Sequence, residues 1–255
     1  MSTQSEIEHW QDYLEAALPS TGGTPLTVRI YRETSSTQDV ARSFAPGKAL
    51  VVADQQTAGR GRLGRSWQSK PGASVLMSVC WPADHIGTTH DRISMSTGVA
   101  VARAIEHLAP DTEVRLKWPN DVLVDGKKIA GILIEGTGAT FVIGIGLNVT
   151  PDACAAPEIS HQSTSLTQLR HSVDRLKIIE AVYTELDHVL SNPNPSKVLM
   201  DWRSRAALGQ MQTFEQAGQQ ITGEVLDLDP DHGLIVRRDS GELITLPAAT
   251  TSVVK

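Results

Sequence analysis

Three arginines and three glycines are set close together within residues 56–67, and this pattern suits the binding of an anion. The stretch begins at Gln56, ends at Trp67 and contains the run Gly-Arg-Gly-Arg-Leu-Gly-Arg. Its planar guanidinium groups can form paired hydrogen bonds with carboxylate or phosphate oxygens, and they belong to Arg60, Arg62 and Arg65. We expect the glycines to let the backbone approach a ligand closely and to adopt positive φ; they are Gly59, Gly61 and Gly64.

Elements on both sides must hold this arginine loop, residues 57–67, in place. Apolar runs at residues 49–53 and 74–80 predict buried strands before and after it. The loop would leave one strand of a sheet and return to the next, so its ends are fixed and its middle is free to close over a ligand. A disordered, RGG-like nucleic-acid tether is the alternative. It is disfavoured because such tethers occur as long repeats without flanking strands.

A second group of candidate binding residues lies at a predicted helix start within residues 33–40. The run Ser-Ser-Thr-Gln at residues 35–38 offers hydroxyl and amide groups to a neutral polar ligand. Ser36 and Asp39 also have the spacing of a capping box, in which the two side chains satisfy backbone N–H groups of the first turn. The sequence leaves two interpretations open: a cap only, or a cap that also contacts a ligand.

A predicted strand at residues 113–118 carries one further candidate, Lys117. Val114, Leu116 and Trp118 alternate onto one face, so Lys117 points to the other. A Pro-Asn-Asp turn at 119–121, an Asp-Gly hairpin signal at 125–126 and apolar runs at 122–124, 127–135 and 141–148 predict an antiparallel meander. Three glycines interrupt its last two strands: Gly131, Gly144 and Gly146. Glycine inside a strand indicates either a bulge or a close approach by a ligand or another backbone.

The remaining elements predict an α/β (α+β) fold with a mixed, largely antiparallel sheet and flanking helices. Helical spacing predicts helices at 4–18 and 93–108, and two more that start at the caps Asp174 and Ser196. The polar segment 150–165 is either a lid or a plain surface connection. Short runs at 220–228, 234–238 and 242–246 predict a small β barrel. We therefore expect a larger α/β domain of residues 1–207 and a C-terminal barrel of residues 208–255.

Composition restricts the class of partner. The 255 residues include 23 Lys or Arg and 29 Asp or Glu, a formal net charge of −6, so the arginine loop is a basic site on an acidic chain and favours a small anion over nucleic acid. Residues 211–255 hold seven acidic and three basic side chains, which argues against an oligonucleotide-binding barrel. Neither a membrane span nor an export signal is predicted. Cys80 and Cys154 have no disulfide or metal-ligand spacing, so we expect a reducing cytoplasm.

Four motifs in fixed order resemble those of the biotin protein ligases. They are Gly59-Arg-Gly-Arg-Leu-Gly-Arg-Ser-Trp67, Lys117-Trp-Pro-Asn-Asp121, Lys128-Ile-Ala-Gly-Ile-Leu-Ile-Glu135 and Gly144-Ile-Gly-Leu-Asn148. The resemblance covers nearly the whole chain, and it implies a catalytic domain similar to that of class II aminoacyl-tRNA synthetases followed by an SH3-like barrel. It also implies formation of biotinyl-5′-AMP from biotin and ATP with Mg²⁺. Biotin then passes to one lysine of a biotin carboxyl carrier protein domain in a biotin-dependent carboxylase.

The resemblance further implies roles for individual residues. Biotin would contact Ser36, Thr37, Gln38, Gln56, Arg60, Gly61, Arg62 and Lys117. The nucleotide would contact Arg62, Arg65, Trp67, Asn120, Asp121, Gly131 and Asn148. Lys117, Arg60 and Arg62 are the implied catalytic residues, and metal ligands are not assigned. Where some relatives stack a tryptophan on adenine, residues 163–166 of this chain are Ser-Thr-Ser-Leu, so no aromatic residue is assigned to adenine.

Two other interpretations of the same residues are disfavoured. A lipoate protein ligase is disfavoured by the paired polar groups for the ligand's rings and by the terminal barrel. A non-catalytic nucleic-acid or regulatory binding protein is disfavoured by the acidic balance. The segment before residue 26 is too short for the helix-turn-helix domain of repressor members, so we expect the enzyme role alone. Edge strands leave a homodimer open. The barrel is expected either to dock the carrier, which is slightly favoured, or to complete the enzyme's structure.

Overall fold

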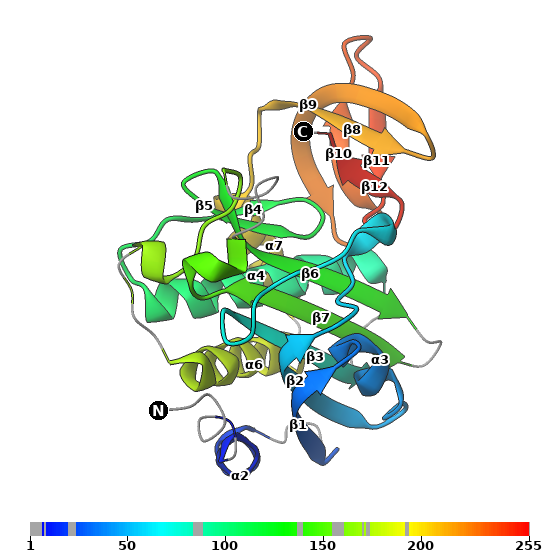
Figure 1. Ribbon diagram of the computed structural model, residues 1–255. Helices are drawn as coiled ribbons and strands as arrows, with labels where there is room; N and C mark the ends of the chain where they lie inside the picture. Colours follow the sequence, from blue (N-terminus) through cyan, green and yellow to red (C-terminus); the bar gives the residue numbers. More distant parts are fainter. Residues whose placement is uncertain are drawn as a thin grey trace.

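The computed structural model describes residues 7, 9–19, 24–83, 89–136, 140–154, 161–169, 171, 174–191 and 194–254. They form a larger sheet with its helices and a smaller C-terminal sheet above one end of it (Figure 1). Among these residues, no helix combines the length and the apolar character needed to cross a membrane.

The larger sheet has seven strands in the order β1-β2-β3-β7-β6-β5-β4. Only β1 and β2 pair in parallel, and the other neighbours are antiparallel, which confirms the predicted mixed, largely antiparallel sheet. The strands are β1 (Leu26–Thr34), β2 (Lys48–Gln56), β3 (Ser74–Pro82), β4 (Val114–Lys117), β5 (Asp121–Val124), β6 (Lys127–Gly136) and β7 (Thr140–Asn148).

The predicted meander is the β4–β7 part of this sheet. Its β5–β6 turn places Asp125 and Gly126 at positive φ, 51° and 72°, as the two-residue hairpin signal requires. Of the predicted turn between β6 and β7, only Gly136 lies within the described residues. The arginine loop joins β2 to its antiparallel neighbour β3, so the prediction for its two ends is confirmed.

Helices α4 (His90–Leu108) and α6 (Arg175–Ser191) cover one face of the sheet (Figure 1). Ile132, Ile143 and Ile145 project from β6 and β7 into the apolar core that these helices complete. Helix α3 (Thr37–Arg42) packs on the other face, where Ala41 joins a small core with Val142. Because side chains alternate along a strand, this second face is left to α3 and to the arginine loop.

Helix ends test the predicted caps. Asp174 accepts a hydrogen bond from the Leu176 N–H (2.8 Å) at the start of α6, as predicted. The predicted cap at Ser196 is wrong: α7 (Pro195–Arg205) is capped by Asn194, which accepts from the Lys197 N–H at 3.1 Å. Pro195 takes the first helical position, which its fixed φ favours, and this moves the start toward the N-terminus. Helix α2 spans Trp10–Ala17; residues 4–6 and 8 of the predicted helix lie outside the described residues.

The C-terminal region forms a five-stranded antiparallel sheet in the order β11-β10-β9-β8-β12. Its strands are β8 (Met211–Gln216), β9 (Gln219–Asp229), β10 (Gly233–Arg237), β11 (Leu243–Leu246) and β12 (Thr251–Val253). The sequence predicted β9, β10 and β11 but missed β8 and the three-residue β12. The domain boundary between residues 207 and 208 stays a prediction.

Candidate active site

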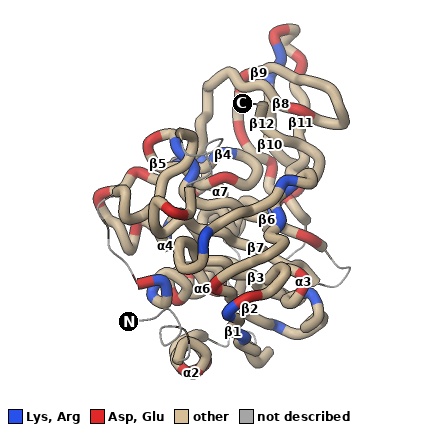
Figure 2. The backbone as a smooth tube through the Cα atoms, in the orientation of Figure 1, with Lys and Arg blue, Asp and Glu red and all other residues tan. Residues whose placement is uncertain are grey.

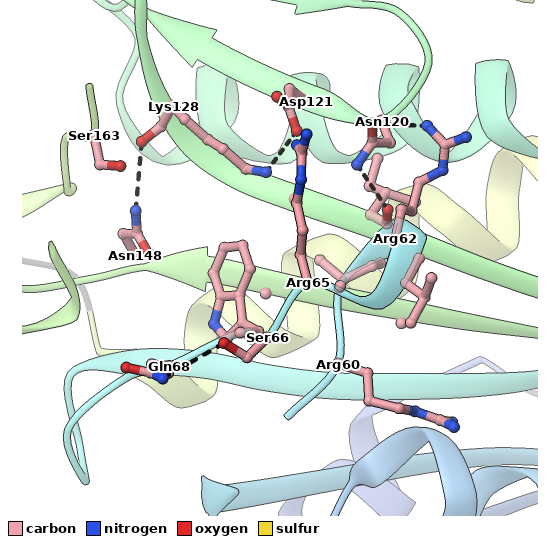
Figure 3. A pocket seen from close by; sticks show the side chains of 18 of the residues that line it. Arg60, Arg62, Arg65, Ser66, Gln68, Asn120, Asp121, Lys128, Asn148 and Ser163 are labelled. Carbon is pink, nitrogen blue, oxygen red and sulfur yellow. Dashed lines mark hydrogen bonds and ion pairs between the residues drawn. The ribbon is translucent and has the colours of Figure 1, made fainter. Parts of the chain in front are cut away.

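A cavity of about 520 Å³ lies between the arginine loop and the sheet face that α4 and α6 leave uncovered (Figure 3). Its lining includes all of the residues predicted for the site: Ser36, Thr37, Gln38, Gln56, Arg60, Gly61, Arg62, Arg65, Trp67, Lys117, Asn120, Asp121, Gly131 and Asn148. The fold therefore brings together side chains from positions 36 to 148 of the chain.

The strand register gives this cavity a floor of small residues. Gly131 of β6 pairs with Gly146 of β7, and Gly144 of β7 pairs with Ser78 of β3. None of the four has a large side chain, so the floor leaves room above it for other groups. The register is regular at Gly144 and Gly146, so these two glycines provide space and do not mark bulges.

The indole of Trp67 lies on the shelf formed by Gly131 and Gly146. A Cβ atom at Gly146 would lie 2.5 Å from the ring, and one at Gly131 would lie 2.7 Å from it. The close approach predicted for these glycines is therefore made by the protein's own indole. Within the described part of the chain, its buried Nε1–H has no hydrogen-bond acceptor. Trp67 forms an apolar wall of the cavity.

Adding a methyl group at Gly146 should force this indole off the shelf. We expect Gly146→Ala to destabilise the fold by about 1–3 kcal/mol, the usual cost of overpacking a closely packed site. Gly98→Ala is the matched control, because its Cβ would lie 3.6 Å from Leu116, an ordinary contact, and alanine favours a helix over glycine. The melting temperature should fall for Gly146→Ala and hold or rise for Gly98→Ala. Equal melting temperatures would contradict the direct packing of the Trp67 indole on Gly146.

The arginine loop is folded on itself as a small hairpin. Arg60 and Ser66 form an antiparallel bridge, and the Gly61 N–H donates to the Arg65 carbonyl at 2.7 Å. Of the three glycines only Gly64 has positive φ (74°), so that prediction is wrong for Gly59 and Gly61. Gly59 is needed for space instead, since a Cβ there would lie 2.4 Å from a backbone oxygen of Trp67. The second left-handed position is taken by the exposed Leu63 (φ 54°).

One end of the cavity is polar and neutral. Thr37 donates its N–H to Gln56 Oε1 at 2.7 Å, and its hydroxyl lies 3.0 Å from that oxygen and 2.8 Å from Ser78 Oγ. The predicted capping box is wrong: Ser36 is buried but makes no side-chain capping bond, and Asp39 pairs with Arg60 at 2.7 Å. Ser36 is thus placed against the cavity and does not satisfy the helix.

The other end is cationic. Arg62, Arg65, Lys117 and Lys128 line it, and among the described lining residues they face one carboxylate, Asp121. Arg60 also lines the cavity, but it lies apart from Arg62 and Arg65 (Figure 3) and pairs with Asp39 of α3. Figure 2 shows basic residues along the loop that crosses this face and at the β4–β5 end of the sheet. Lys117 is half-buried at the end of β4, opposite Asp121 of β5. Such a cluster in a chain of net charge −6 is suited to a ligand with several negative charges.

Lys128 was quoted in a motif but not predicted as a site residue. Its ammonium lies 2.5 Å from Asp121 Oδ1 and 5.4 Å from the centre of the Trp67 ring. Simple alternation would put it on the core face with Ala130. The β5–β6 register shifts, however: Val122 pairs with Ala130 and Leu123 with Lys128, so Ile129 is an extra, bulged residue. A bulge reverses the alternation, and Lys128 therefore points into the cavity beside Gly131.

Two of the loop arginines are held by protein oxygens. Arg60 pairs with Asp39 and, at 3.2 Å, with Glu135. Arg62 donates to the carbonyls of Ala248 and Thr251 (3.0 Å for Thr251) and to Asn120 Oδ1 at 3.2 Å. Burial lowers the pKa of Arg62, but a guanidinium group stays charged at physiological pH. The C-terminal sheet therefore contacts a predicted site residue, and its Ser252 and Val253 also line the cavity.

Part of the segment 150–165, for which the sequence left a lid and a plain surface connection open, contributes backbone to the cavity wall. The Lys128 N–H donates to the Gln162 carbonyl (2.8 Å), and the Thr164 N–H donates to the Lys128 carbonyl (2.9 Å). Asn148 Nδ2 donates to the Thr164 carbonyl at 3.0 Å, so this predicted site residue holds the segment in position. It also donates to the Lys128 carbonyl at 3.4 Å (Figure 3). Ser163 lines the cavity, and residues 155–160 of the predicted lid are outside the described residues.

Comparison with known proteins agrees with this geometry. Residues 29–152 match the model of the biotin/lipoate A/B protein ligase family. The bifunctional ligase/repressor BirA of Bacillus spizizenii is 33% identical over 230 residues, which cover 83% of this chain and 70% of that protein. The biotin--[acetyl-CoA-carboxylase] ligase of Mycobacterium tuberculosis is 35% identical over 208 residues, covering 78% of this chain and 76% of that one.

A solved structure extends the likeness to three dimensions. The biotin protein ligase from Aquifex aeolicus in complex with biotin and ATP superposes with a TM-score of 0.77 and 25% identity, over 90% of this chain and 99% of that one. Since this match covers 90% of this chain and nearly all of that one, the similarity is not confined to the motifs.

Proposed function

Because this chain belongs to the biotin protein ligases of the biotin/lipoate A/B protein ligase family, we propose that it activates biotin with ATP and transfers biotin to a lysine of an acetyl-CoA carboxylase. One observation carries the proposal: a single cavity joins a neutral polar end at Thr37 and Gln56 to a cationic end at Lys117 and the arginine loop. Biotin has the same order of groups, a polar ring system at one end and a carboxylate at the other.

The roles of the residues follow from these two ends. Ser36, Thr37, Gln38 and Gln56 would surround the ring system and satisfy its ureido group. Arg60, Gly61, Arg62 and Lys117 would bind the carboxylate, which places that carboxylate beside the nucleotide. Arg65, Trp67, Asn120, Asp121, Gly131 and Asn148 would line the nucleotide side, together with Lys128, which the sequence analysis had not assigned.

The first step joins two anions. A carboxylate oxygen of biotin forms a bond to the α-phosphorus of ATP, and the bond from that phosphorus to the bridging oxygen of pyrophosphate breaks. The barrier comes chiefly from charge repulsion and alignment, so fixed cations can lower it without a covalent enzyme nucleophile. Lys117 and the loop arginines supply such cations at the end of the cavity where the carboxylate would lie.

Magnesium would enter with the phosphates of ATP. The cavity lining offers a single carboxylate, Asp121, which already pairs with Lys128, and the described residues contain no cluster of three His, Cys, Asp or Glu that could hold a metal. Mg²⁺ commonly binds through phosphate oxygens, waters and one or two carboxylates, so this lining suits a metal carried by the nucleotide. When bound, it would neutralise part of the phosphate charge.

The second step transfers biotin to the carrier. The neutral amine of a carrier lysine attacks the carbonyl carbon of biotinyl-5′-AMP, the bond from that carbon to the phosphate oxygen breaks, AMP leaves and the amine loses a proton to solvent. The adenylate must stay shielded from water until the amine arrives, which gives the arginine loop a role as a cover. Both cysteines are buried and free, which supports a cytoplasmic setting for the reaction. A homodimer stays a prediction.

Pyrophosphate release tests the proposed function. The protein is incubated with ATP and Mg²⁺ and then given biotin, lipoate or neither, and released pyrophosphate is measured over time. Biotin should give release well above the other two samples. Release in the lipoate sample but not in the biotin sample would replace the proposal with a lipoate ligase. Equal release in the sample with neither ligand would indicate hydrolysis of ATP to AMP and pyrophosphate.

Replacing Arg62 with glycine should let the intermediate escape. The guanidinium that joins the loop to Asn120 and to two carbonyls of the C-terminal sheet is lost, so the loop should no longer cover the adenylate. We expect Arg62→Gly to biotinylate exposed lysines of an added bystander protein, such as serum albumin, detected with labelled streptavidin.

Leu63→Gly is the matched control for this experiment. It adds a glycine to the same loop at an exposed position with φ of 54°, where glycine is tolerated without strain, and it keeps every arginine. Bystander labelling by Arg62→Gly alone assigns retention to the guanidinium. Labelling by both variants would assign retention of the adenylate to the stiffness of the loop. Labelling by neither would refute the role of the arginine loop as a cover over the adenylate.

A further inference from the structure

We propose that Ser78 is a positioning residue that takes the proton of the Thr37 hydroxyl at the ring end of the cavity, so that Thr37 presents an acceptor beside the donor amide of Gln56. This inference rests on the proposed function for the identity of the ligand. Ser78 lies on β3, outside every motif that the sequence analysis singled out. Its side chain would not contact the reacting atoms; it would act through Gln38 and Thr37.

Ser78 is placed at the centre of a buried polar network. It is 1% exposed, and it pairs with Gly144 across the sheet. Its Oγ lies 3.0 Å from Gln38 Oε1 and 2.8 Å from Thr37 Oγ. A Cβ at Gly144 would lie 2.5 Å from Gln38 Oε1, so the missing side chain at Gly144 makes the space in which the Gln38 amide meets Ser78.

The Gln38 amide has only one orientation that satisfies its neighbours. Its Nε2 lies 2.9 Å from the Val142 carbonyl and 3.4 Å from the Leu133 carbonyl, and a carbonyl can only accept. The nitrogen must therefore face the backbone and Oε1 must face Ser78. Since an amide oxygen only accepts, the single proton of Ser78 is donated to Gln38.

The direction of this bond determines what Thr37 can do. With its own proton used, Ser78 Oγ is an acceptor toward Thr37, and the nearest proton is that of the Thr37 hydroxyl at 2.8 Å. The competing acceptor, Gln56 Oε1, is more distant at 3.0 Å and already accepts the Thr37 N–H at 2.7 Å. The Thr37 proton is thus directed into the protein, and the lone pairs of Thr37 Oγ are what the cavity presents.

The backbone N–H of Thr37, independently of Ser78, makes Gln56 a donor. Its Oε1 is occupied by Thr37, so the N–H groups of Nε2 are the part of the amide left for a ligand. The ring end therefore offers an acceptor next to a donor. That pair complements a ring N–H adjacent to a ring C=O, as in the cyclic urea of biotin. The dithiolane ring of lipoate has neither group, and a site built to hydrogen-bond such groups strongly rejects a ligand that lacks them.

The test separates positioning from plain stability. Ser78→Ala and the nearly isosteric Ser78→Cys are compared with wild type for biotin-dependent pyrophosphate release in the presence of excess carrier domain, so that the enzyme turns over. Binding of biotin, and of biotin methylated on both ureido nitrogens, is measured by calorimetric titration. We expect the KM for biotin to rise about tenfold in both variants, the scale of one lost hydrogen bond, with kcat within about twofold. The preference for biotin over its methylated analogue should fall by a similar factor, and Ser78→Thr should restore it.

Ser74→Ala is the matched control. Ser74 is equally buried on the same face of β3, and its hydroxyl bonds Ser69 at 2.7 Å, outside the cavity lining. Its KM for biotin should stay at the wild-type value. An unchanged KM in Ser78→Cys, or an equal loss of affinity for biotin, its analogue and ATP, would overturn the proposal. Wild type without biotin-dependent release would instead refute the proposed function, and with it the ligand assigned here.

Discussion

Lys117→Ala should slow the formation of biotinyl-5′-AMP by about two orders of magnitude or more while leaving the fold intact. This is the scale expected when a preorganised charge is removed from a developing transition state. Lys117 is half-buried at the end of β4 and lines the cavity beside Asp121, so its ammonium is partly shielded from water and its attraction for an anion is stronger than at the surface. Loss of the charge leaves the carboxylate and the α-phosphate to repel each other.

A single-turnover measurement of adenylate formation, with enzyme in excess over biotin, isolates this step from product release. Arg115→Ala is the control, because Arg115 precedes Lys117 by two residues on the same face of the strand and is exposed. It should react at the wild-type rate with the same melting temperature. An unchanged rate in Lys117→Ala would remove Lys117 from the mechanism. A larger loss in Lys128→Ala would assign the main cation to Lys128.

The sequence predicted which residues gather at the cavity better than it predicted the contacts that hold them there. Alternation placed Lys117 correctly, since Val114, Leu116 and Trp118 are buried on the other face. The hairpin at Asp125 and Gly126 also formed as predicted. Both predictions depend on contacts within a few residues, which the chain encodes locally.

Features that depend on distant pairing were not predictable in the same way. The bulge at Ile129 comes from the register between β5 and β6, and only that register turns Lys128 into the cavity. Ser78 is one of several small residues in an apolar run, and its role appears only when β3 lies beside β7 and α3 packs above both. The Ser36 capping box failed because Arg60, far along the chain, pairs with Asp39.

The C-terminal sheet shows the same limit at a larger scale. Its acidic composition favoured a module that docks the carrier. Composition carries no information, however, about which backbone carbonyls face the site. In the structure, Asp91 of α4 accepts the Ala248 N–H at 2.6 Å, and Arg92 pairs with Asp231 at 2.7 Å. Burial raises the pKa of Asp91, and the hydrogen bond from Ala248 opposes that rise. The sheet is thus bonded to the helix beside the cavity.

Removal of residues 208–255 should therefore lower both half-reactions together. Arg62 would lose two carbonyl acceptors, and hydrogen bonds to charged groups contribute roughly 1.5–3 kcal/mol each, so adenylation should fall about tenfold or more. The melting temperature should also fall, because the apolar surface under the sheet becomes exposed. The measurements are pyrophosphate release for the first step and, for the second, transfer from preformed biotinyl-5′-AMP to a carrier domain.

A full-length variant keeps this prediction testable if the shortened chain does not fold. Asp231→Ala removes the partner of Arg92 at the contact between the sheet and α4, and Asp239→Ala is the control, since Asp239 lies at the β10–β11 turn away from the cavity lining. If the C-terminal sheet supports the active site, Asp231→Ala should slow adenylation and transfer by the same factor, and Asp239→Ala should change neither rate. The contrary outcome is that adenylation stays at the wild-type rate in both the shortened chain and Asp231→Ala, and only transfer falls. The sheet would then dock the carrier, because its loss would affect the encounter with the carrier lysine and not the alignment of biotin and ATP.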